Sequence, residues 1–154
     1  MAQELMKPSE KELLLNLIAR HRAVIYGQRA TNFHLPTNLR KETKDYDILT
    51  SKPKSKAEEL VKELNKYYPN KYEVIPAKYK KTFKIKNRET GETFSDFTGT
   101  TRLPESYNEL GIRRASLKYS EKKLKKSIKN PASSFRHEKD RDTLNKIKQG
   151  KRRW

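Results

Sequence analysis

The sequence predicts an α/β (α+β) fold, in which helices pack on a mixed β-sheet. Short apolar runs lie between turn-forming residues, as strands do, and longer segments place apolar residues at helical spacing. No internal repeat is present. This mixture favours a layered arrangement of helices on a sheet, within a single domain over residues 1–154.

The N-terminal part is expected to form a helix and two strands. Ser9 is a suitable N-cap for the helix. The apolar side of that helix consists of Leu13, Leu14, Leu17 and Ile18. Residues 23–27 and 44–50 are predicted to be the first two strands, with a short helix over residues 28–35 between them.

The middle part is expected to contribute a helix and three further strands. Ser55 and Glu58 have capping-box spacing, which predicts a helix from there to about Tyr68. The three segments that follow have strand character, and a turn over residues 88–91 separates the last two. These segments are 72–76, 82–87 and 92–98.

Two more helices are predicted near the end of the chain, at residues 118–129 and 137–149. Arg113, Arg114 and Lys118 lie at the start of this region. These cations either contact the substrates of a functional site, or belong to a charged helix face, which is the simpler interpretation.

Net charge is the most informative property of the composition. The chain carries +18 at pH 7, and residues 101–154 hold 17 Lys and Arg against six Asp and Glu, a net of +11. Such a local excess is typical of a surface for a polyanion, and nucleic acid, such as tRNA or a DNA end, is the expected partner. We therefore expect a basic helical C-terminal third at about residues 113–154. The alternative is a solvated, lysine-rich surface that only keeps the protein soluble.

Composition also excludes several classes of protein. Without cysteine the chain has no disulfide, no cysteine-ligated zinc and no thiol nucleophile. No apolar run approaches membrane-spanning length and no secretory signal is visible, so we expect no membrane partner and a cytoplasmic location. The glycine patterns of P-loop and Rossmann proteins are absent as well.

Two aspartates one residue apart are the strongest candidates for a functional site. Asp45 and Asp47 lie in a strand-like run, where this spacing puts both carboxylates on one face. Adjacent negative charges repel unless a cation lies between them, and Mg²⁺ takes oxygen ligands that it shares with phosphates. The pair therefore predicts a metal site. The alternative is a pair of surface acids on an amphipathic strand.

The segment before this pair has the form of a phosphate site. The first predicted strand ends in Gly27, and a helix with free N–H groups at its start is expected to follow. Gly27 and the following amides, those of Gln28 and Arg29, are thus candidates to receive the β- and γ-phosphates of an NTP. Arg40 or Lys44 would neutralise the triphosphate, or both are surface charges.

Together these motifs resemble the nucleotidyltransferase superfamily, which shares the DNA polymerase β-like catalytic fold. Residues 25–27 match the opening of its signature, a hydrophobic residue followed by Gly and then Gly or Ser. Residues 45–47 match the Asp-hydrophobic-Asp motif, and Asp96 matches the third aspartate on a later strand. The resemblance implies a mixed sheet with the site at the first two strands.

The pattern looks most like a small branch of that superfamily, which includes abortive-infection toxins and viral minimal relatives. The spacing of Arg40 and Thr43 to the aspartate pair and the closing run 136–144 carry this likeness. The chain departs from the pattern in two ways. Gln28 stands where a small residue is usual, and the long gap before the pair, which contains Pro36, suggests an added loop.

The resemblance also implies an activity. Asp45, Asp47 and Asp96 would be the catalytic, metal-binding residues of a nucleotidyltransferase that uses Mg²⁺ or Mn²⁺, with two ions expected. Such an enzyme transfers NMP from an NTP to an acceptor hydroxyl, here on tRNA or a DNA end, and releases pyrophosphate. Asp45 and Asp47 would hold the ion that carries the triphosphate. Asp96 would help to hold the second ion and to orient the acceptor hydroxyl.

Two alternatives remain beside this interpretation. One is a toxin-type nucleotidyltransferase that modifies tRNA or a protein and has a protein partner such as an antitoxin. The other is a non-catalytic, basic nucleic-acid-binding protein on the same scaffold. The three carboxylates favour the enzymes, and a position of Asp96 away from the pair would favour the binding protein.

Overall fold

A computed structural model describes the chain except residues 1–6, 79–80 and 153–154. The described strands form one seven-stranded sheet. The strands are β1 (Val24–Tyr26), β2 (Tyr46–Thr50), β3 (Tyr72–Pro76), β4 (Thr82–Asn87), β5 (Thr93–Gly99), β6 (Ser106–Glu109) and β7 (Ile112–Ala115). The helices are α2 (Glu10–His21), α3 (Gly27–Phe33), α4 (Pro53–Tyr67), α5 (Leu117–Lys129) and α6 (His137–Arg152), with 3-10 turns η1 (Thr37–Leu39) and η2 (Pro131–Arg136).

The sheet is mixed, as the sequence predicts. Its strand order is β3-β4-β5-β2-β1-β7-β6. The central strand β2 is antiparallel to β1 and parallel to β5, and β1 is parallel to β7 on its other side. The expected α/β (α+β) fold class is therefore confirmed. The strands that end in Gly27 and that carry Asp47 are direct neighbours, so the chain returns to the same place after the long loop between them.

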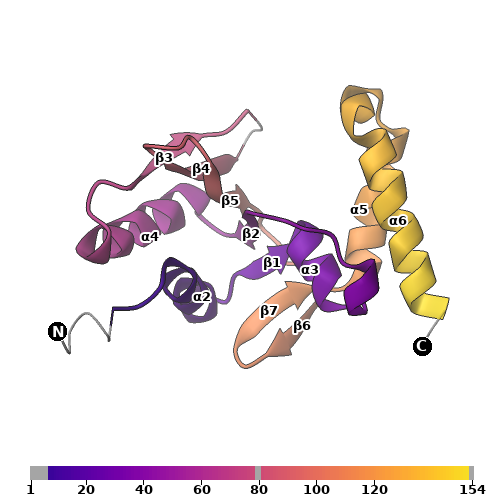
Figure 1. The fold of residues 1–154 in the computed structure, drawn as a ribbon, viewed down its shortest axis with the longest axis horizontal. Helices are drawn as coiled ribbons and strands as arrows, with labels where there is room; N and C mark the ends of the chain where they lie inside the picture. The colour runs from indigo at the N-terminus through magenta and orange to yellow at the C-terminus, as the bar shows by residue number, and fades with distance from the viewer. Residues whose placement is uncertain (1–6, 79–80, 153–154) are drawn as a thin grey trace.

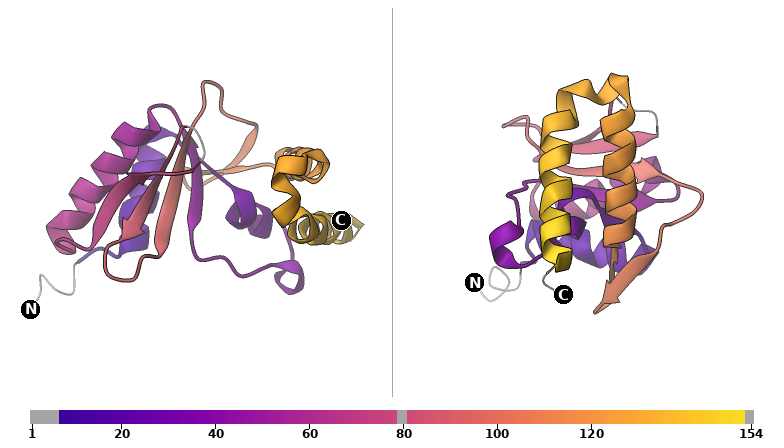
Figure 2. Two further views of the ribbon diagram at one scale, coloured as in Figure 1. Left: turned by 90° about the horizontal axis from the view of Figure 1, so that it is seen from above. Right: turned by 90° about the vertical axis from the view of Figure 1, so that its right-hand side faces the viewer.

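Helices cover the sheet from two sides. Helices α2 and α4 lie together on one side, whereas α3 and the α5–α6 hairpin lie on the other (Figures 1 and 2). The largest fully buried side chains lie where α2 and α4 meet the strands, and they include Leu14, Leu17, Ile18, Ile48, Leu60, Leu64, Ile85 and Phe97. Ala30 of α3 and Ile147 of α6 are also fully buried, so the helices on the other side have apolar packing of their own.

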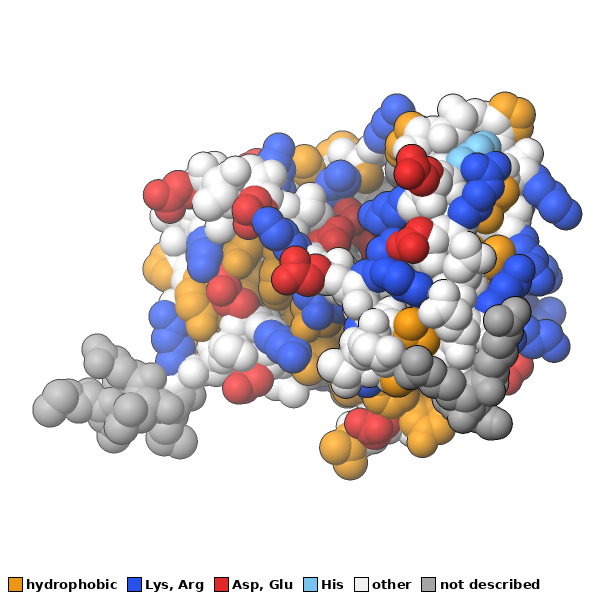
Figure 3. All heavy atoms as spheres, turned by 45° about the vertical axis from the view of Figure 1, so that its right-hand side comes forward, with side chains coloured by type: hydrophobic (Ala, Val, Ile, Leu, Met, Phe, Trp, Pro, Cys, Tyr) orange, Lys and Arg blue, Asp and Glu red, His pale blue; other side chains and the backbone are white. Residues whose placement is uncertain are grey.

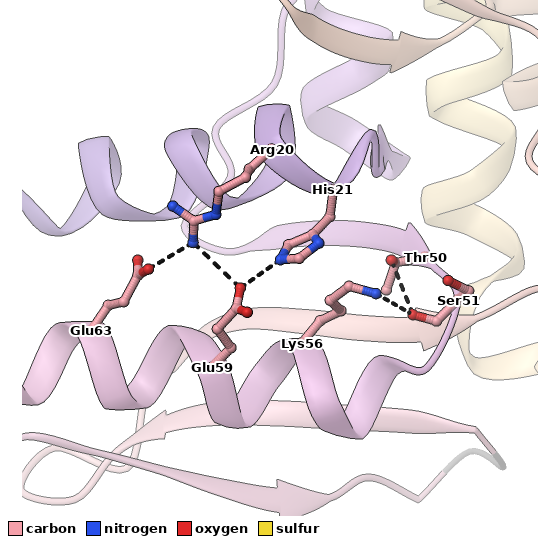
Figure 4. A network of polar contacts seen from close by, with 7 residues as sticks. All are labelled: Arg20, His21, Thr50, Ser51, Lys56, Glu59 and Glu63. Atoms are coloured by element: carbon pink, nitrogen blue, oxygen red, sulfur yellow. Dashed lines mark hydrogen bonds and ion pairs between the residues drawn. The ribbon is translucent and has the colours of Figure 1, made fainter.

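Polar contacts join α2 to α4 at the edge of this core (Figure 4). Arg20 Nη2 donates to Glu63 Oε1 at 2.6 Å and to Glu59 Oε2 at 3.3 Å. His21 Nε2 lies 2.6 Å from the same Glu59 oxygen. These contacts fix the end of α2, and with it the start of β1, on the helix that follows β2.

Several boundaries agree with the sequence. Ser9 caps α2 by accepting a hydrogen bond from Glu12 N at 3.0 Å, as predicted. The strands expected at 72–76 and 82–87 have those bounds, and β5 begins one residue later than predicted. The late helices are also present, although α6 continues to Arg152.

Two expectations are wrong. Helix α4 begins at Pro53, two residues before the predicted capping box, because a proline at the first helical position starts a helix well. Arg113 and Arg114 lie on strand β7, not on a charged helix face. The β6–β7 hairpin that contains them was not predicted, because its strands are short and polar and owe their place to parallel pairing with β1.

In the described ranges, no helix combines the length and apolar character needed to cross a membrane. The predicted basic C-terminal third extends to residue 154, so its last two residues lie outside the described part of the chain.

Candidate active site

Strand register brings the predicted aspartates together. Asp47 of β2 lies directly opposite Asp96 of the parallel strand β5, so both side chains point to the same face of the sheet. Asp45 immediately precedes β2 and lies two residues before Asp47, on that face as well. Their neighbours Tyr46 and Ile48 are buried on the opposite face, in the core. The alternation of apolar and acidic residues thus sets the direction of all three carboxylates.

The three carboxylates form one cluster. Each offers an oxygen, and these oxygens all lie within 4.8 Å of one another. The side chains are partly buried, and Oδ1 of Asp96 is buried with no hydrogen-bond partner within the described residues. An orphaned carboxylate oxygen beside two other carboxylates is costly without a cation. The donor set therefore fits a hard divalent ion, for which oxygen ligands are suited.

The cluster is electrostatically strained. Burial, together with the nearby charges of Asp45 and Asp96, raises the pKa of Asp47 to about 7. Burial likewise raises the pKa of Asp96, with Lys84 acting against the shift. Desolvation and like charge both disfavour the ionised form, so the free energy of the cluster falls when a positive charge is shared among the carboxylates.

Gly27 makes room for this cluster. It follows β1 with φ +72°, and a Cβ placed on it would lie 2.4 Å from Asp47 Oδ2. The next side chain, Gln28, turns along its own helix and donates from Nε2 to Asn32 Oδ1 at 2.8 Å. The backbone at Gly27 therefore borders the carboxylates directly, and the Gln28 side chain does not lie between them.

Arg29 holds the loop that carries the first aspartate. Its Nε donates to the carbonyl of Asp45 at 2.8 Å, and its Nη2 donates to the carbonyls of Thr43 and Lys44 at 3.3 and 3.2 Å. Its guanidinium also stacks 3.6 Å from the centroid of the Tyr46 ring. These contacts give Arg29 a positioning role at the entry to β2, beside its predicted contact with phosphate.

The other two predicted cations lie outside the carboxylate cluster. Arg40 donates from Nε to the carbonyl of Leu35 at 2.8 Å and so closes the η1 turn. Lys44 is exposed on the loop next to Asp45. Their predicted contacts with a triphosphate remain predictions.

Three further cations surround the cluster, and sequence reasoning did not assign them to it. Lys84 lies opposite Asp96 on the antiparallel strand β4. Lys123 reaches in from α5, with Nζ 4.6 Å from the centroid of the Tyr26 ring, and both it and Arg136 of η2 act on the charge of Asp47. Figure 3 shows acidic side chains in a hollow beside the Lys- and Arg-rich helical hairpin. Lys123 thus belongs to the site as well as to the basic third.

Comparison with known proteins identifies the architecture. No protein-family model matches the chain, and no curated protein matches it in sequence. Among solved structures, the chain is similar to the Megavirus polyadenylate synthase, with a TM-score of 0.81 and 16% identity over 92% of this chain. The chain has a nucleotidyltransferase fold. It spans 30% of the length of that viral protein.

Two weaker structural likenesses were also found. Helicobacter pylori JHP933 has a TM-score of 0.49 and 14% identity over 94% of this chain and 65% of its own. An antigenic nucleotidyltransferase-like protein from Paracoccidioides brasiliensis has a TM-score of 0.47 and 16% identity over 90% of this chain and 76% of its own. Neither adds to the assignment. The fold assignment rests on the viral structure, and it agrees with the fold that the resemblance in Gly27 and the aspartates implies.

Proposed function

We propose that this protein is a metal-dependent nucleotidyltransferase, which transfers NMP from an NTP to an acceptor hydroxyl on nucleic acid and releases pyrophosphate. The observation that carries this proposal is the carboxylate cluster, in which Asp96 Oδ1 is buried and has no hydrogen-bond partner in the described part of the chain. Three carboxylates this close to one another are expensive unless cations share them. The nucleotidyltransferase fold supports the class of reaction.

The cofactor would be Mg²⁺ or Mn²⁺, with two ions expected. When bound, such ions neutralise the developing charge and clamp the attacking and leaving oxygens. Asp45 and Asp47 would hold the ion that accompanies the triphosphate, and Asp96 would help to hold the second. The oxygen-only donor set of this cluster supports this choice of metal.

The chain's own residues would position the substrates and manage charge. The acceptor oxygen forms a bond to the α-phosphorus while the bond from that phosphorus to the α,β-bridging oxygen breaks, and pyrophosphate leaves with the electron pair. Asp96, whose pKa is raised by burial, would accept the hydroxyl proton and pass it to water. Gly27, with no side chain, leaves the backbone open to the phosphates beside Asp47.

The cations around the cluster would offset the charge of the nucleotide. Lys123 and Lys84 act on Asp47 and Asp96 from α5 and β4, so a triphosphate entering between them would meet both. Backbone amides of Gln28 and Arg29 remain the proposed seat for its terminal phosphates. A toxin-type enzyme with tRNA or a protein as acceptor, or a non-catalytic binder, remains the alternative.

The decisive experiment incubates the protein with each labelled NTP, Mg²⁺ or Mn²⁺, and separate pools of tRNA, other RNA, DNA and protein. Label transferred to one pool identifies both the donor and the acceptor. Asp47→Asn should abolish the transfer, whereas the matched Asp142→Asn, at a half-exposed surface position on α6, should retain it. If the folded protein binds nucleic acid but transfers no nucleotide under any of these conditions, a non-catalytic nucleic-acid-binding protein becomes the better interpretation.

A further inference from the structure

An exposed aromatic ring lies at the tip of the helical hairpin. Phe135, in the η2 turn that joins α5 to α6, has 72% of its surface exposed. In Figure 1 this turn lies at the far end of the hairpin from the C-terminus. Within the described ranges it is one of five large hydrophobic side chains with exposed surface, and its sequence neighbour is Arg136, which acts on the charge of Asp47. The ring is therefore exposed next to a cation of the site.

The chain around this ring is purely cationic. The segment 122–137 contains no acidic residue, and its cations are Lys122, Lys123, Lys125, Lys126, Lys129 and Arg136. Lys122, Lys125 and Lys129 form a stripe with i, i+3 and i+7 spacing on the exposed surface. Lys126, four residues after Lys122 and three after Lys123, lies between that stripe and Lys123.

The remaining cations line the way from the ring to the carboxylates. Lys123 lies by Tyr26 and acts on Asp47, while Lys126 and Arg136 lie close enough to Lys123 to act on its charge. Arg136 is held in place by an ion pair with buried Asp140, with Nη2 and Oδ1 3.6 Å apart. A negatively charged strand lying here would thus have cations from the tip of the hairpin to the site.

We propose that this surface, formed by Lys126, Phe135 and Arg136 with Lys123 at its inner end, binds single-stranded nucleic acid by stacking a base on the Phe135 ring. Single strands expose the faces of their bases, which duplexes keep stacked within the helix, and aromatic side chains beside a basic groove are the usual platform for them. The inference rests on the proposed function, because it makes the bound strand the acceptor and directs its terminal hydroxyl toward Asp47.

The test measures binding alone, without NTP, so that its result does not depend on catalysis. Anisotropy of labelled short RNA and DNA single strands, and of a duplex of the same sequence, is measured for the parent, Phe135→Leu and Phe135→Trp. Loss of one stacked base should weaken single-strand binding of Phe135→Leu by about 5- to 100-fold. Phe135→Trp should bind at least as well as the parent, and duplex binding should be alike in all three.

A second readout reports the contact itself. The indole introduced by Phe135→Trp should lose fluorescence when a single strand binds, after subtraction of the signal that the parent gives from Trp154. The matched control is Tyr67→Leu, which removes a different exposed aromatic, 41% exposed on α4, and should leave single-strand binding unchanged. Circular dichroism establishes that each variant is folded.

The outcomes separate this inference from the proposed function. Single-strand binding that needs the ring supports the inference even if no nucleotide is transferred. Equal binding by parent and Phe135→Leu, or an indole that is not quenched, overturns it even if transfer is normal. A Phe135→Leu defect that is equal for duplex and single strand also overturns it, because base stacking would then not be the contact.

Discussion

The carboxylate of Asp47 occupies the space that a side chain at Gly27 would need, so this position has room only for a glycine. A Cβ at Gly27 would lie 2.4 Å from Oδ2 and 3.2 Å from Cγ of Asp47. Gly27 directly follows Tyr26, the residue that lies opposite Asp47 in the antiparallel pair of β1 and β2. The glycine at the end of β1 therefore leaves room for the Asp47 carboxylate in the site.

Gly27→Ala should damage both stability and activity. The positive φ alone costs a non-glycine residue about 1–2 kcal/mol, and the added methyl must displace the Asp47 carboxylate as well. We expect a loss of roughly 2–3 kcal/mol in the free energy of unfolding, and at least a tenfold loss of nucleotidyl transfer. Urea denaturation and the transfer assay measure these.

Gly91→Ala is the matched control for that substitution. Gly91 has a similar φ of +75°, but the nearest atom to its added Cβ would be Lys86 Cε at 3.6 Å, an ordinary contact. The Gly91→Ala variant should lose only the stability that a positive φ costs a non-glycine residue, and it should keep full activity. If both variants lose stability and activity equally, the close approach of Gly27 to Asp47 has no functional consequence.

Asp47→Asn should abolish activity while stabilising the metal-free protein. The amide keeps the shape but removes the repulsion that Asp45 and Asp96 exert on this position. We expect more than about a 100-fold loss of transfer, or about 2.7 kcal/mol, and a metal-free melting temperature roughly 2–4 °C higher for about 1 kcal/mol of relief. Mg²⁺ should raise the melting temperature of the parent and not that of the variant. Near-normal turnover by a folded Asp47→Asn protein contradicts the metal role.

Lys123→Gln should weaken the binding of NTP, because the triphosphate loses a cation that lies beside Asp47. A charge-assisted contact of about 1.4 kcal/mol corresponds to a tenfold increase in the dissociation constant. Lys122→Gln, one residue earlier on the exposed stripe, should leave that constant unchanged. Calorimetric titration with a non-hydrolysable NTP measures both dissociation constants. Equal dissociation constants for the two variants would mean that Lys123, like Lys122, does not contact the NTP.

Glu59→Gln should reduce stability in a pH-dependent way. Hydrogen bonds from His21 and then Arg20 hold the pKa of Glu59 below its usual range. A lowered folded-state pKa contributes stability above the unfolded pKa of about 4.3, and this contribution is lost as the pH falls through the folded value. Because these groups are half exposed, the loss at pH 6 should be about 0.5–1 kcal/mol.

Thermal unfolding at several pH values measures that difference. The stability gap between the parent and Glu59→Gln should narrow steadily below pH ~4 and vanish in stronger acid. Glu58→Gln removes the exposed carboxylate next to Glu59 on α4, serves as a control and should show no such gap. A gap that widens with acid would be inconsistent with the ion pairs in Figure 4.

Much of the candidate site could be predicted from the sequence because its signals are local. The spacing of Asp45 and Asp47 places them on one face of a strand whatever else the chain does. A glycine at the end of an apolar run indicates a sharp turn, and Gly27 has the positive φ that such a turn needs. The caps and apolar spacing that predict α2 are local in the same sense.

The pairing of strands that are distant in the sequence determined the remaining features of the site. The prediction that Asp96 joins the pair depended on a resemblance, and the reason for it is the parallel register of β2 and β5, which no local pattern encodes. The β6–β7 hairpin likewise exists because β1 offers it an edge, which brings Arg113 into the sheet.

The position of Lys84 shows most clearly what local sequence patterns cannot predict. Counting back from the turn at residues 88–91 would put Phe83 opposite Asp96, because each strand would advance one residue at a time. An irregularity between Ile85 and Lys86 shifts the register by one residue, so that Lys84 takes that place. A one-residue shift exchanges the two faces of a strand, and here it brings a cation to the carboxylates.

The sequence alone therefore determined the acidic pair, the glycine turn, the helices and the excess of positive charge, since composition and short spacings encode them. Only the tertiary structure decided which cations face the carboxylates and which face solvent. Lys122 and Lys123 are adjacent, chemically identical and both exposed, yet with α5 packed against α3 it is Lys123 whose Nζ lies 4.6 Å from the centroid of the Tyr26 ring and which acts on the charge of Asp47. Helix orientation is set by contacts distant in the chain, and that is the physical reason why the sequence could not assign these roles.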